Sequence, residues 1–423
     1  MRRAGPRLCS SVEAKTGPRK RLSQTFTAFK YPNYRLWFFG QLVSLFGTWM
    51  QSTAQGFLVY ELTRSVAYLG YVAFASGLAN WLFTLYAGAV ADRMPRRTLL
   101  LITQNCMMIL AFILGALTLL HVVQPWHVLV LAFALGVANA FDAPARLAFV
   151  LEMVDREDLI NAVALNSSMF NMATVMGPAA AGLAYARFGP GWCFMLNGIS
   201  FIAIIIGLAL MKLKPWSPPA RRNSPWTDIK DGVHYVVRHP SIRVMVGLVG
   251  TIALFGYSFG TLLPAWAVEI LGGDAQTNGL LQSARGIGAL IAALAIASSG
   301  RIRYRGRLLT AGTFVFPLAL VAFAFVRWLP LSLLTLVVIG GSGMLAMNLL
   351  NSLVQSLAAD ELRGRVMSMY SLTFMGLMSA GGLWAGTLAQ RIGEPKTIVI
   401  GAGLTFFFAL LAWVFVPRLR HIQ

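Results

Sequence analysis

Twelve long apolar stretches, each near the length needed to cross a lipid bilayer, follow one another along this 423-residue chain. A transmembrane helix needs about 20 mostly apolar residues, and in lipid only helices and closed barrels satisfy their own backbone hydrogen bonds. The stretches are continuously apolar, whereas barrel strands alternate apolar and polar residues. The sequence therefore predicts an all-α membrane protein with twelve transmembrane helices. The expected spans are 36–60, 67–91, 98–121, 126–146, 161–186, 192–212, 241–269, 277–299, 307–326, 331–356, 365–390 and 396–416.

The composition excludes an ordinary soluble domain, since 57% of the residues are hydrophobic and only 12% are charged. The formal net charge of +20 is a possible sign of nucleic-acid binding. However, the lysines and arginines lie in short segments beside the apolar stretches rather than on one soluble face. We therefore expect no nucleic-acid partner, and the lipid bilayer as the surroundings of the chain.

The distribution of lysine and arginine predicts the orientation, because cytoplasmic loops of membrane proteins collect these residues. With twelve spans, the two termini and every second loop lie on one side, and that side holds nearly all of the positive charge. The exceptions on the other side are Arg64, Arg187, Arg327, Arg391 and Lys396, and Arg285 alone lies deep within a span. Both termini are therefore expected in the cytoplasm, with the protein in a plasma membrane, most simply a bacterial inner membrane.

The two halves of the chain resemble each other when one is shifted by 204 residues. The shift superposes Ser167 on Ser371, Gly177 on Gly381, Gly182 on Gly386, Arg187 on Arg391 and Gly189 on Gly393. Two pseudo-symmetric six-helix bundles follow from this repeat, a common construction in transporters. The expected organisation is a basic cytoplasmic tail (1–33), an N-terminal bundle (34–212), a linker (213–240), a C-terminal bundle (241–417) and a short tail (418–423). Within the linker, Ile229, Val233, Val236 and Val237 predict one face of an amphipathic helix at the cytoplasmic surface.

The segment GAVADRMPRR, between the second and third spans, contains Gly88, Asp92, Arg93, Arg96 and Arg97. These residues match the G-x-x-x-D-R-x-x-R-R signature of the major facilitator superfamily, and the signature lies where that family has it. Residues 30–417 as a whole resemble the family's architecture. The segments GQLVSLFGTWMQ, FDAPAR and LRGRVMSMYSLTFMG further resemble the branch that includes the enterobactin exporter and related drug and siderophore efflux proteins.

The resemblance implies a conformational latch at this segment. A carboxylate at a helix C-terminus is unfavourable with the dipole of its own helix, whereas the N-terminus of a neighbouring helix attracts it. In the family this aspartate, here Asp92, is thought to meet the start of helix eleven, here near Gly364 and Arg365. The motif arginines would add ion pairs across the same gap, with Asp360 and Glu361 as candidate acids. Alternatively, the arginines only mark the topology.

Polar side chains inside spans indicate where a substrate is expected to bind, because they are costly in lipid and usually face the protein interior. The first span carries such residues at helical spacing on one face: Gln41, Ser44, Thr48, Gln51 and Gln55. The family lines its cavity with helices one, four, seven and ten. The substrate-cavity candidates are therefore Thr48, Gln51, Gln55, Asn139, Arg285 and Asn351. The alternative for each amide is a hydrogen bond between packed helices.

Two further features concern the direction of transport and its coupling to protons. The segment MGPAAAG, with Gly177, Pro178 and Gly182, resembles the motif that marks antiporters of this superfamily, although its glycine spacing departs from the usual one, and a closely packed or kinked helix is the alternative. Proton coupling is implied by the resemblance, with Asp142 and Glu269 as the candidate carboxylates. Asp142 and Arg146 are four residues apart and could instead form an ion pair.

The predicted function is export of a small, largely apolar molecule of the drug or siderophore class by alternating access, as a proton antiporter. A lipid or lysolipid flippase on the same fold is the alternative, and a membrane-embedded enzyme is a distant one. The five histidines and three cysteines form no catalytic or metal-binding constellation, and no nucleotide-binding loop is present. We expect no catalytic residues, no metal, no cofactor, a small-molecule substrate as partner, and a monomer.

Overall fold

The computed structural model describes residues 26–213, 225–298 and 305–415, and in this part of the chain the regular elements are all helices. Most of the two expected tails and part of the linker lie outside the described residues. Apart from the short helix η1 (Thr27–Lys30), the first half forms α2 (Pro32–Thr63), α3 (Val66–Arg93), α4 (Arg96–Leu119), α5 (Pro125–Met153), α6 (Leu159–Phe188) and α7 (Pro190–Leu210). We call α2 to α7 the N-terminal group.

The second half begins with the linker helix α8 (Pro225–Arg238). It continues with α9 (Pro240–Thr251), η2 (Ile252–Gly256), η3 (Tyr257–Leu262), α10 (Leu263–Ala265), η4 (Trp266–Ile270), α11 (Ala275–Ser298), α12 (Arg305–Phe325), α13 (Leu329–Leu357), α14 (Arg363–Ile392) and α15 (Glu394–Phe415). We call α9 to α15 the C-terminal group. Proline is the first residue of α2, α5, α7 and α9, where its missing N–H would have had no helical partner in any case.

Eleven helices in the described ranges are long and apolar enough to cross a membrane. The remaining expected span is α2, which has 32 residues and is therefore long enough. It falls below the others in hydropathy because of its polar face, on which Gln41, Ser44 and Gln51 are buried against neighbouring helices. Burial of this face inside the protein explains how a less apolar helix takes a place among the spans.

The expected span 241–269 is a single apolar segment, Pro240–Ile270, but it is not one continuous α-helix. After α9 the backbone forms a π-helical turn, η2, then a 3-10 segment, η3, and after three α-helical residues a second π-helical turn, η4. Gly256, Gly260 and Pro264 lie in this irregular stretch. Such departures from the i→i−4 ladder are frequent at functional sites of helical proteins.

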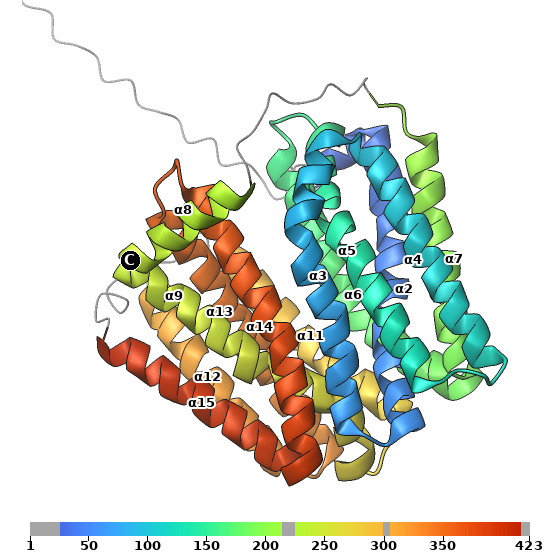
Figure 1. Cartoon of the computed structure of the whole chain (residues 1–423), viewed down its shortest axis with the longest axis vertical. Helices are drawn as coiled ribbons and strands as arrows, with labels where there is room; N and C mark the ends of the chain where they lie inside the picture. Colours follow the sequence, from blue (N-terminus) through green and yellow to red (C-terminus); the bar gives the residue numbers. More distant parts are fainter. Residues whose placement is uncertain (1–25, 214–224, 299–304, 416–423) are drawn as a thin grey trace, which may run out of the picture.

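The two groups of helices lean against each other at one end and diverge at the other (Figure 1). Each helix packs mainly within its own group, and the groups meet chiefly where α3 lies along α14 and where α6 lies along α11. The end that carries α8 and the turns after α3, α5 and α13 holds most of the lysines and arginines. We call it the basic end, and the other, where α2 ends and α3 begins, the opposite end.

Glycines bring the two groups into close contact near the opposite end. A Cβ atom built on Gly386 of α14 would lie 2.9 Å from the Cα of Gly70 in α3, and one built on Gly279 of α11 would lie 2.5 Å from the carbonyl oxygen of Pro178 in α6. Both separations are too short for a real side chain. Small residues at membrane helix interfaces allow such close backbone approach.

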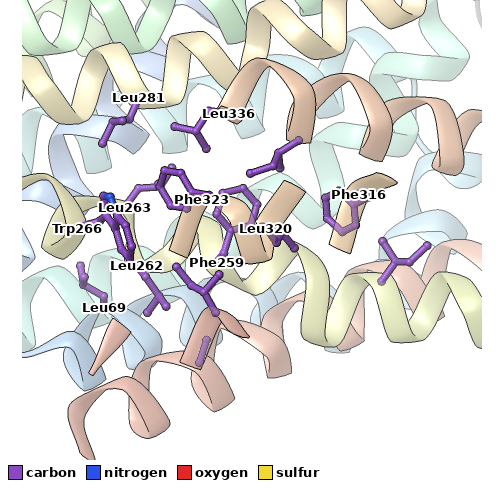
Figure 2. Close-up of a cluster of buried hydrophobic side chains, with 14 of the residues drawn as sticks. Leu69, Phe259, Leu262, Leu263, Trp266, Leu281, Phe316, Leu320, Phe323 and Leu336 are labelled. Atoms are coloured by element: carbon purple, nitrogen blue, oxygen red, sulfur yellow. The ribbon is translucent and has the colours of Figure 1, made fainter. Parts of the chain in front are cut away.

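A buried apolar cluster continues across both groups at this end (Figure 2). In the C-terminal group, Trp266 stacks on Phe323 with ring centroids 4.6 Å apart, and Phe259 packs beside them. Leu69 of α3 belongs to the same cluster and lies near Leu262. The opposite end is therefore closed by apolar packing as well as by glycine contacts.

The linker helix α8 forms where the amphipathic pattern predicts a helix. Val236 is buried, whereas Val233 and Val237 are exposed, and the side chain of Ile229 lies outside the described part. The helix packs on α14 and α9. The backbone N–H of Ala359, in the turn before α14, donates to the hydroxyl of Tyr235 at 3.2 Å. The linker is thus attached to the C-terminal group at the basic end.

Candidate transport site

A hydrogen bond between Tyr60 and Glu269 joins the two groups at the opposite end. Tyr60, in the last turn of α2, donates its hydroxyl to Glu269 Oε1 of η4 at 2.5 Å. The Tyr60 side chain is almost fully buried. Beside it, Tyr185 of α6 donates to Glu61 of α2 within the N-terminal group. Glu269, a candidate coupling residue, therefore lies in the contact between the groups.

A second connection at this end is a helix cap that comes from the other group. The first N–H groups of a helix have no partner within the helix. Gln390, in the last turn of α14, accepts with Oε1 from the backbone N–H groups of Val66 and Ala67 at 2.9 and 3.3 Å and from the hydroxyl of Ser65 at 3.0 Å. The start of α3 is thus capped by α14, and separation of the groups at this end would remove the cap.

The antiporter-like motif lies in the other interface between the groups. A Cβ on Gly182 would lie 2.9 Å from the Cα of Gln276 in α11, and the Pro178 carbonyl approaches Gly279 of the same helix. Gly177 instead packs against Trp49 of α2, where its Cβ would lie 2.5 Å from the Cβ of Trp49. The motif therefore provides close packing, as in the alternative interpretation, and its role in antiport stays a prediction.

The residues of the predicted latch lie at the basic end. Arg96 forms an ion pair with Glu152 of α5 at 2.7 Å, and Arg97 donates to the Ala209 carbonyl of α7 at 2.7 Å, so both bond within the N-terminal group. Arg93 is exposed. A Cβ on Gly88 would meet no atom within 4 Å. The side chain of Asp92 lies outside the part that the structure describes.

The other side of the predicted latch is the first turn of α14. Asp360, a candidate acid for the motif arginines, pairs with Arg363 of its own group, and Glu361 is exposed. Arg365 is half-buried, and its carbonyl faces Gly232 of the linker helix, whose Cβ would lie 3.0 Å away. The Asp92 latch therefore stays a prediction, and this part of α14 is in contact with α8.

Several of the cavity candidates are engaged inside their own group. Gln51 accepts a 2.6 Å hydrogen bond from Asn197 of α7 and is buried, which matches the helix-packing alternative. Thr48 donates to the Ser44 carbonyl and Asn139 to the Leu135 carbonyl, one turn earlier in the same helix. Asn351 accepts from Gln355 at 2.6 Å, and Gln55 is buried. Thr48, Asn139 and Asn351 are each partly exposed, so their role in a cavity stays a prediction.

The two coupling candidates have different surroundings. Asp142 is buried and accepts hydrogen bonds from Thr103 at 3.0 Å and from Gln104 at 2.8 Å, and Arg146 lies 3.6 Å away on the same helix. All these partners belong to the N-terminal group. Glu269, by contrast, is exposed apart from its bond to Tyr60, across the group boundary. A change in the packing of the two groups therefore acts directly on Glu269 and not on Asp142.

Arg285 is the charged residue that lies deepest within a described span. It is partly exposed, and its guanidinium points to the 3-10 segment η3, where Nη1 lies 2.7 Å from the position of a Cβ on Gly260. The Cζ atom is 6.0 Å from the ring centre of Phe259. No ion pair joins Arg285 to Glu269 among the described residues, and Glu269 accepts the Tyr60 hydroxyl.

Sequence reasoning missed Tyr60, Gln390 and Tyr257, and it missed the irregular backbone around Tyr257. A tyrosine near the end of a span carries no distinctive signal, because tyrosine is enriched at the membrane interface. The irregular backbone had one signal, the spacing of Gly256, Gly260 and Pro264 inside a single apolar run. In the described residues, no three His, Cys, Asp or Glu side chains come together as metal ligands.

These features define a helical carrier with two groups of membrane spans that meet at one end. Residues 23–422 match the family described as transmembrane secretion effector, so the chain belongs to this family of the major facilitator superfamily. It is a membrane transporter of small molecules, and its family and relatives are transporters rather than enzymes.

Three curated relatives illustrate the similarity. The staphyloferrin A transporter of Staphylococcus aureus is 26% identical over 388 residues, covering 90% of this chain and 96% of that one. The multidrug efflux pump Tap of Mycolicibacterium fortuitum is 26% identical over 395 residues, covering 91% and 96%. The enterobactin exporter EntS of Escherichia coli is 26% identical over 414 residues, covering 93% and 94%.

Solved structures share the fold at much lower sequence identity. A mutant of the peptide transporter POT has a TM-score of 0.74 at 12% identity, with 92% of this chain and 95% of that one covered. A bacterial homologue of the human lysosomal transporter Spinster, solved in an inward-facing, unoccupied conformation, has a TM-score of 0.72 at 12% identity, with 92% and 98% covered.

Proposed function

We propose that this protein is a secondary active transporter that exports a small, largely apolar molecule of the drug or siderophore class by alternating access. Its main structural support is the unequal contact between the two groups. Tyr60 bonds to Glu269 and Gln390 caps α3 at the opposite end, whereas Gly88 at the basic end faces open space. A carrier that opens at one end at a time needs contacts of this kind, made in one state and broken in the other.

In this proposal residues 34–212 and 241–417 are the two units that rock against each other, and residues 213–240 link them. The basic end faces the cytoplasm, because cytoplasmic loops collect lysine and arginine. The described conformation is then open to the inside, and both termini are cytoplasmic. The protein functions as a monomer in a bacterial inner membrane. The efflux pump and exporter among its relatives support export as the direction.

Proton antiport is the proposed energy source, with Glu269 as the first candidate for the coupling carboxylate. In the described state Glu269 accepts the Tyr60 hydroxyl. Opening of the opposite end breaks this bond and leaves the carboxylate free to take up a proton from outside. Asp142 is the second candidate, although its hydrogen bonds from Thr103 and Gln104 satisfy the ionised form within one group.

Everted membrane vesicles from cells that express the protein test export and coupling together. With an acidic interior, vesicles should accumulate the efflux dye Hoechst 33342 faster than vesicles without the protein, and nigericin, which collapses the pH gradient, should abolish the difference. Glu269→Gln should behave like nigericin treatment, whereas Asp274→Asn, which removes an exposed carboxylate at the same end, should be neutral. Accumulation that survives nigericin would exclude proton antiport. Equal dye uptake with and without the protein, repeated with an iron-free siderophore, would argue against export.

A lipid flippase is the second candidate, and one feature favours it. An apolar groove of about 300 Å³ lies between α9 and α15, with Val244, Leu248 and Phe415 among its lining residues. Dithionite quenching of NBD-labelled phospholipid in proteoliposomes separates the two functions, because a flippase exposes inner-leaflet lipid to the quencher and a drug exporter does not.

A further inference from the structure

The surroundings of the Arg285 side chain, as well as its depth in the span, indicate what this residue binds. The Arg285 guanidinium of α11 lies against the backbone of η3, and the space it occupies exists because residue 260 is glycine. A charged residue at this depth costs about 2.5 to 3.5 kcal/mol on membrane-insertion scales. An interaction partner that offsets this cost is therefore expected close to the guanidinium.

The protein itself does not supply a group that neutralises the Arg285 charge. Among the described residues, Arg285 has no carboxylate within ion-pair distance and no hydrogen-bond acceptor for its guanidinium. The ring centre of Phe259 lies 6.0 Å from its Cζ atom, and Tyr257 belongs to the same 3-10 segment as Phe259 and Gly260. A cation and an aromatic ring at this distance attract each other by about 0.5 to 1 kcal/mol when exposed. These contacts do not neutralise the charge, and the side chain is partly exposed, so a solute can reach it.

An aromatic cluster surrounds Tyr257, which lies in the 3-10 segment that the guanidinium faces. Tyr257 of η3 packs against Phe316 of α12, with ring centroids 5.5 Å apart, and against Phe374 of α14, at 6.2 Å. The Tyr257 hydroxyl also approaches Gly343 of α13, where a Cβ would lie 2.9 Å from it. Three elements of the C-terminal group bring these rings together, and because Phe316 is fully buried, the accessible rings of the cluster are those of Tyr257 and Phe374.

From this arrangement we infer that Arg285 and Tyr257 form the recognition site for the acidic head of an amphipathic organic anion, whose aromatic or apolar body packs on the Tyr257 cluster. A guanidinium presents a planar fork of N–H donors that matches a carboxylate in two parallel hydrogen bonds. The Tyr257 hydroxyl adds a third donor. The inference rests on the proposed export function and specifies its cargo: an organic acid with an apolar body, rather than a neutral or cationic drug.

Binding to the purified full-length protein in detergent tests the site without transport. The probes are 1-pyrenebutyrate and the neutral 1-pyrenebutanol, which share one aromatic body, and binding is followed by energy transfer from tryptophan to pyrene. The wild type should bind the acid at least tenfold more tightly than the alcohol. Arg285→Gln should remove this preference and leave binding of the alcohol unchanged. Arg285→Lys should restore part of it, because lysine keeps the charge but loses the fork.

Two further variants separate recognition from folding. Gly260→Ala keeps the arginine but places a methyl group 2.7 Å from the present position of Nη1, so the guanidinium must shift and binding of the acid should weaken several-fold. Arg187→Gln removes an exposed arginine at the end of α6 and should change nothing. Equal affinity of the wild type for both probes would overturn the inference. An equal loss for both probes in Arg285→Gln would also overturn it, because that result assigns a structural role.

The inference and the export function can fail separately. If the purified protein prefers the acid but vesicles accumulate neither probe, the site stands and the export function fails. If vesicles accumulate dye normally while the purified protein shows no preference for the acid, export stands and the anion site fails.

Discussion

The two ends of the molecule hold their helices in different ways. At the opposite end, α3 and α14 touch through glycines, Gln390 caps α3, and Tyr60 bonds to Glu269. At the basic end, Arg96 and Arg97 bond to α5 and α7 of their own group, and Gly88 faces open space. The closed end depends on backbone proximity and a few polar bonds, whereas the basic end carries charges that have partners without the other group.

Under the proposed alternating access, this difference explains how a contact between two large helix groups would be reversible. A typical intramolecular hydrogen bond contributes about 0.5 to 1.5 kcal/mol net, so a few such bonds favour one state without fixing it. Arg96 and Arg97 already bond inside their group and Arg93 is exposed, so none of the three is left as a buried unpaired charge when the basic end is open. Each end can therefore lose its contacts with the other group at modest cost.

The largest expected effect comes from filling the closed interface. Gly386→Leu places a side chain where a Cβ already lies 2.7 Å from the Val66 carbonyl and 2.9 Å from Gly70. The opposite end should then be unable to close, and export should fall at least tenfold. Initial dye uptake in everted vesicles measures this. Gly403→Leu on α15, where a Cβ meets no atom within 4 Å, is the matched control, and an equal loss in both variants would show that added bulk alone is responsible.

Removal of the bond between the groups should have the next largest effect. Tyr60→Phe keeps the packing but leaves the Glu269 carboxylate without its donor. Hydrogen bonds to charged groups contribute about 1.5 to 3 kcal/mol, so the closed state of this end should lose at least tenfold in relative population. Labelling by a membrane-impermeant maleimide of a cysteine placed at Ala67, which contributes only its backbone N–H to the cap, should become faster. Tyr71→Phe, at an exposed tyrosine, should leave the rate unchanged, and unaltered labelling in both variants would show that the bond does not hold the end closed.

The predicted latch at the basic end should have a smaller effect. Asp92→Asn removes the charge that would dock on the start of α14, an interaction of about 0.3 to 1 kcal/mol. The resting population should shift toward the state that is open at the basic end, by roughly two- to fivefold, and transport should fall while expression stays normal. Accessibility of a cysteine at Gly88 reports the shift. Unchanged labelling together with unchanged transport would show that Asp92 does not act as a latch at the basic end.

The smallest effect concerns a basic-end contact outside the membrane. Lys30 forms an ion pair with Asp158 at 2.6 Å, and the Tyr31 hydroxyl lies 2.8 Å from the same carboxylate. These hydrogen bonds hold the pKa of Asp158 below its ordinary value, and the bond to Asp158 raises the pKa of Lys30. The Asp158 contribution to stability is present above the unfolded pKa of 3.8 and is lost as pH falls below it; the Lys30 contribution is lost only as pH rises beyond 10.5.

Melting temperatures of the wild type and of Asp158→Asn should therefore differ by the same small amount at every pH between 5 and 9. Because both partners face water, this difference is expected to be slight. A difference that varies across this range would mean that another titrating group acts on the contact.

The spans show how much of the fold can be predicted from the sequence. Eleven expected spans correspond to helices that are long and apolar enough to cross a membrane, and α2 occupies the position of the remaining one. The irregular turns within Pro240–Ile270 were not predicted, because hydropathy and helical periodicity do not distinguish an α-helical turn from a π or 3-10 turn. Their positions depend on what packs against them, including Arg285 beside Gly260.

The sequence by itself determined the class of the protein, the approximate positions of its spans and the residues worth testing, because hydropathy and the GAVADRMPRR motif are properties of contiguous residues. Only the tertiary structure showed which distant side chains are hydrogen-bond partners. Gln51 bonds to Asn197, Glu269 to Tyr60 and Gln390 to the start of α3, across separations of 146, 209 and more than 320 residues. Such pairs depend on how helices pack in three dimensions, and a single sequence contains no direct signal of which distant side chains that packing brings within hydrogen-bond distance.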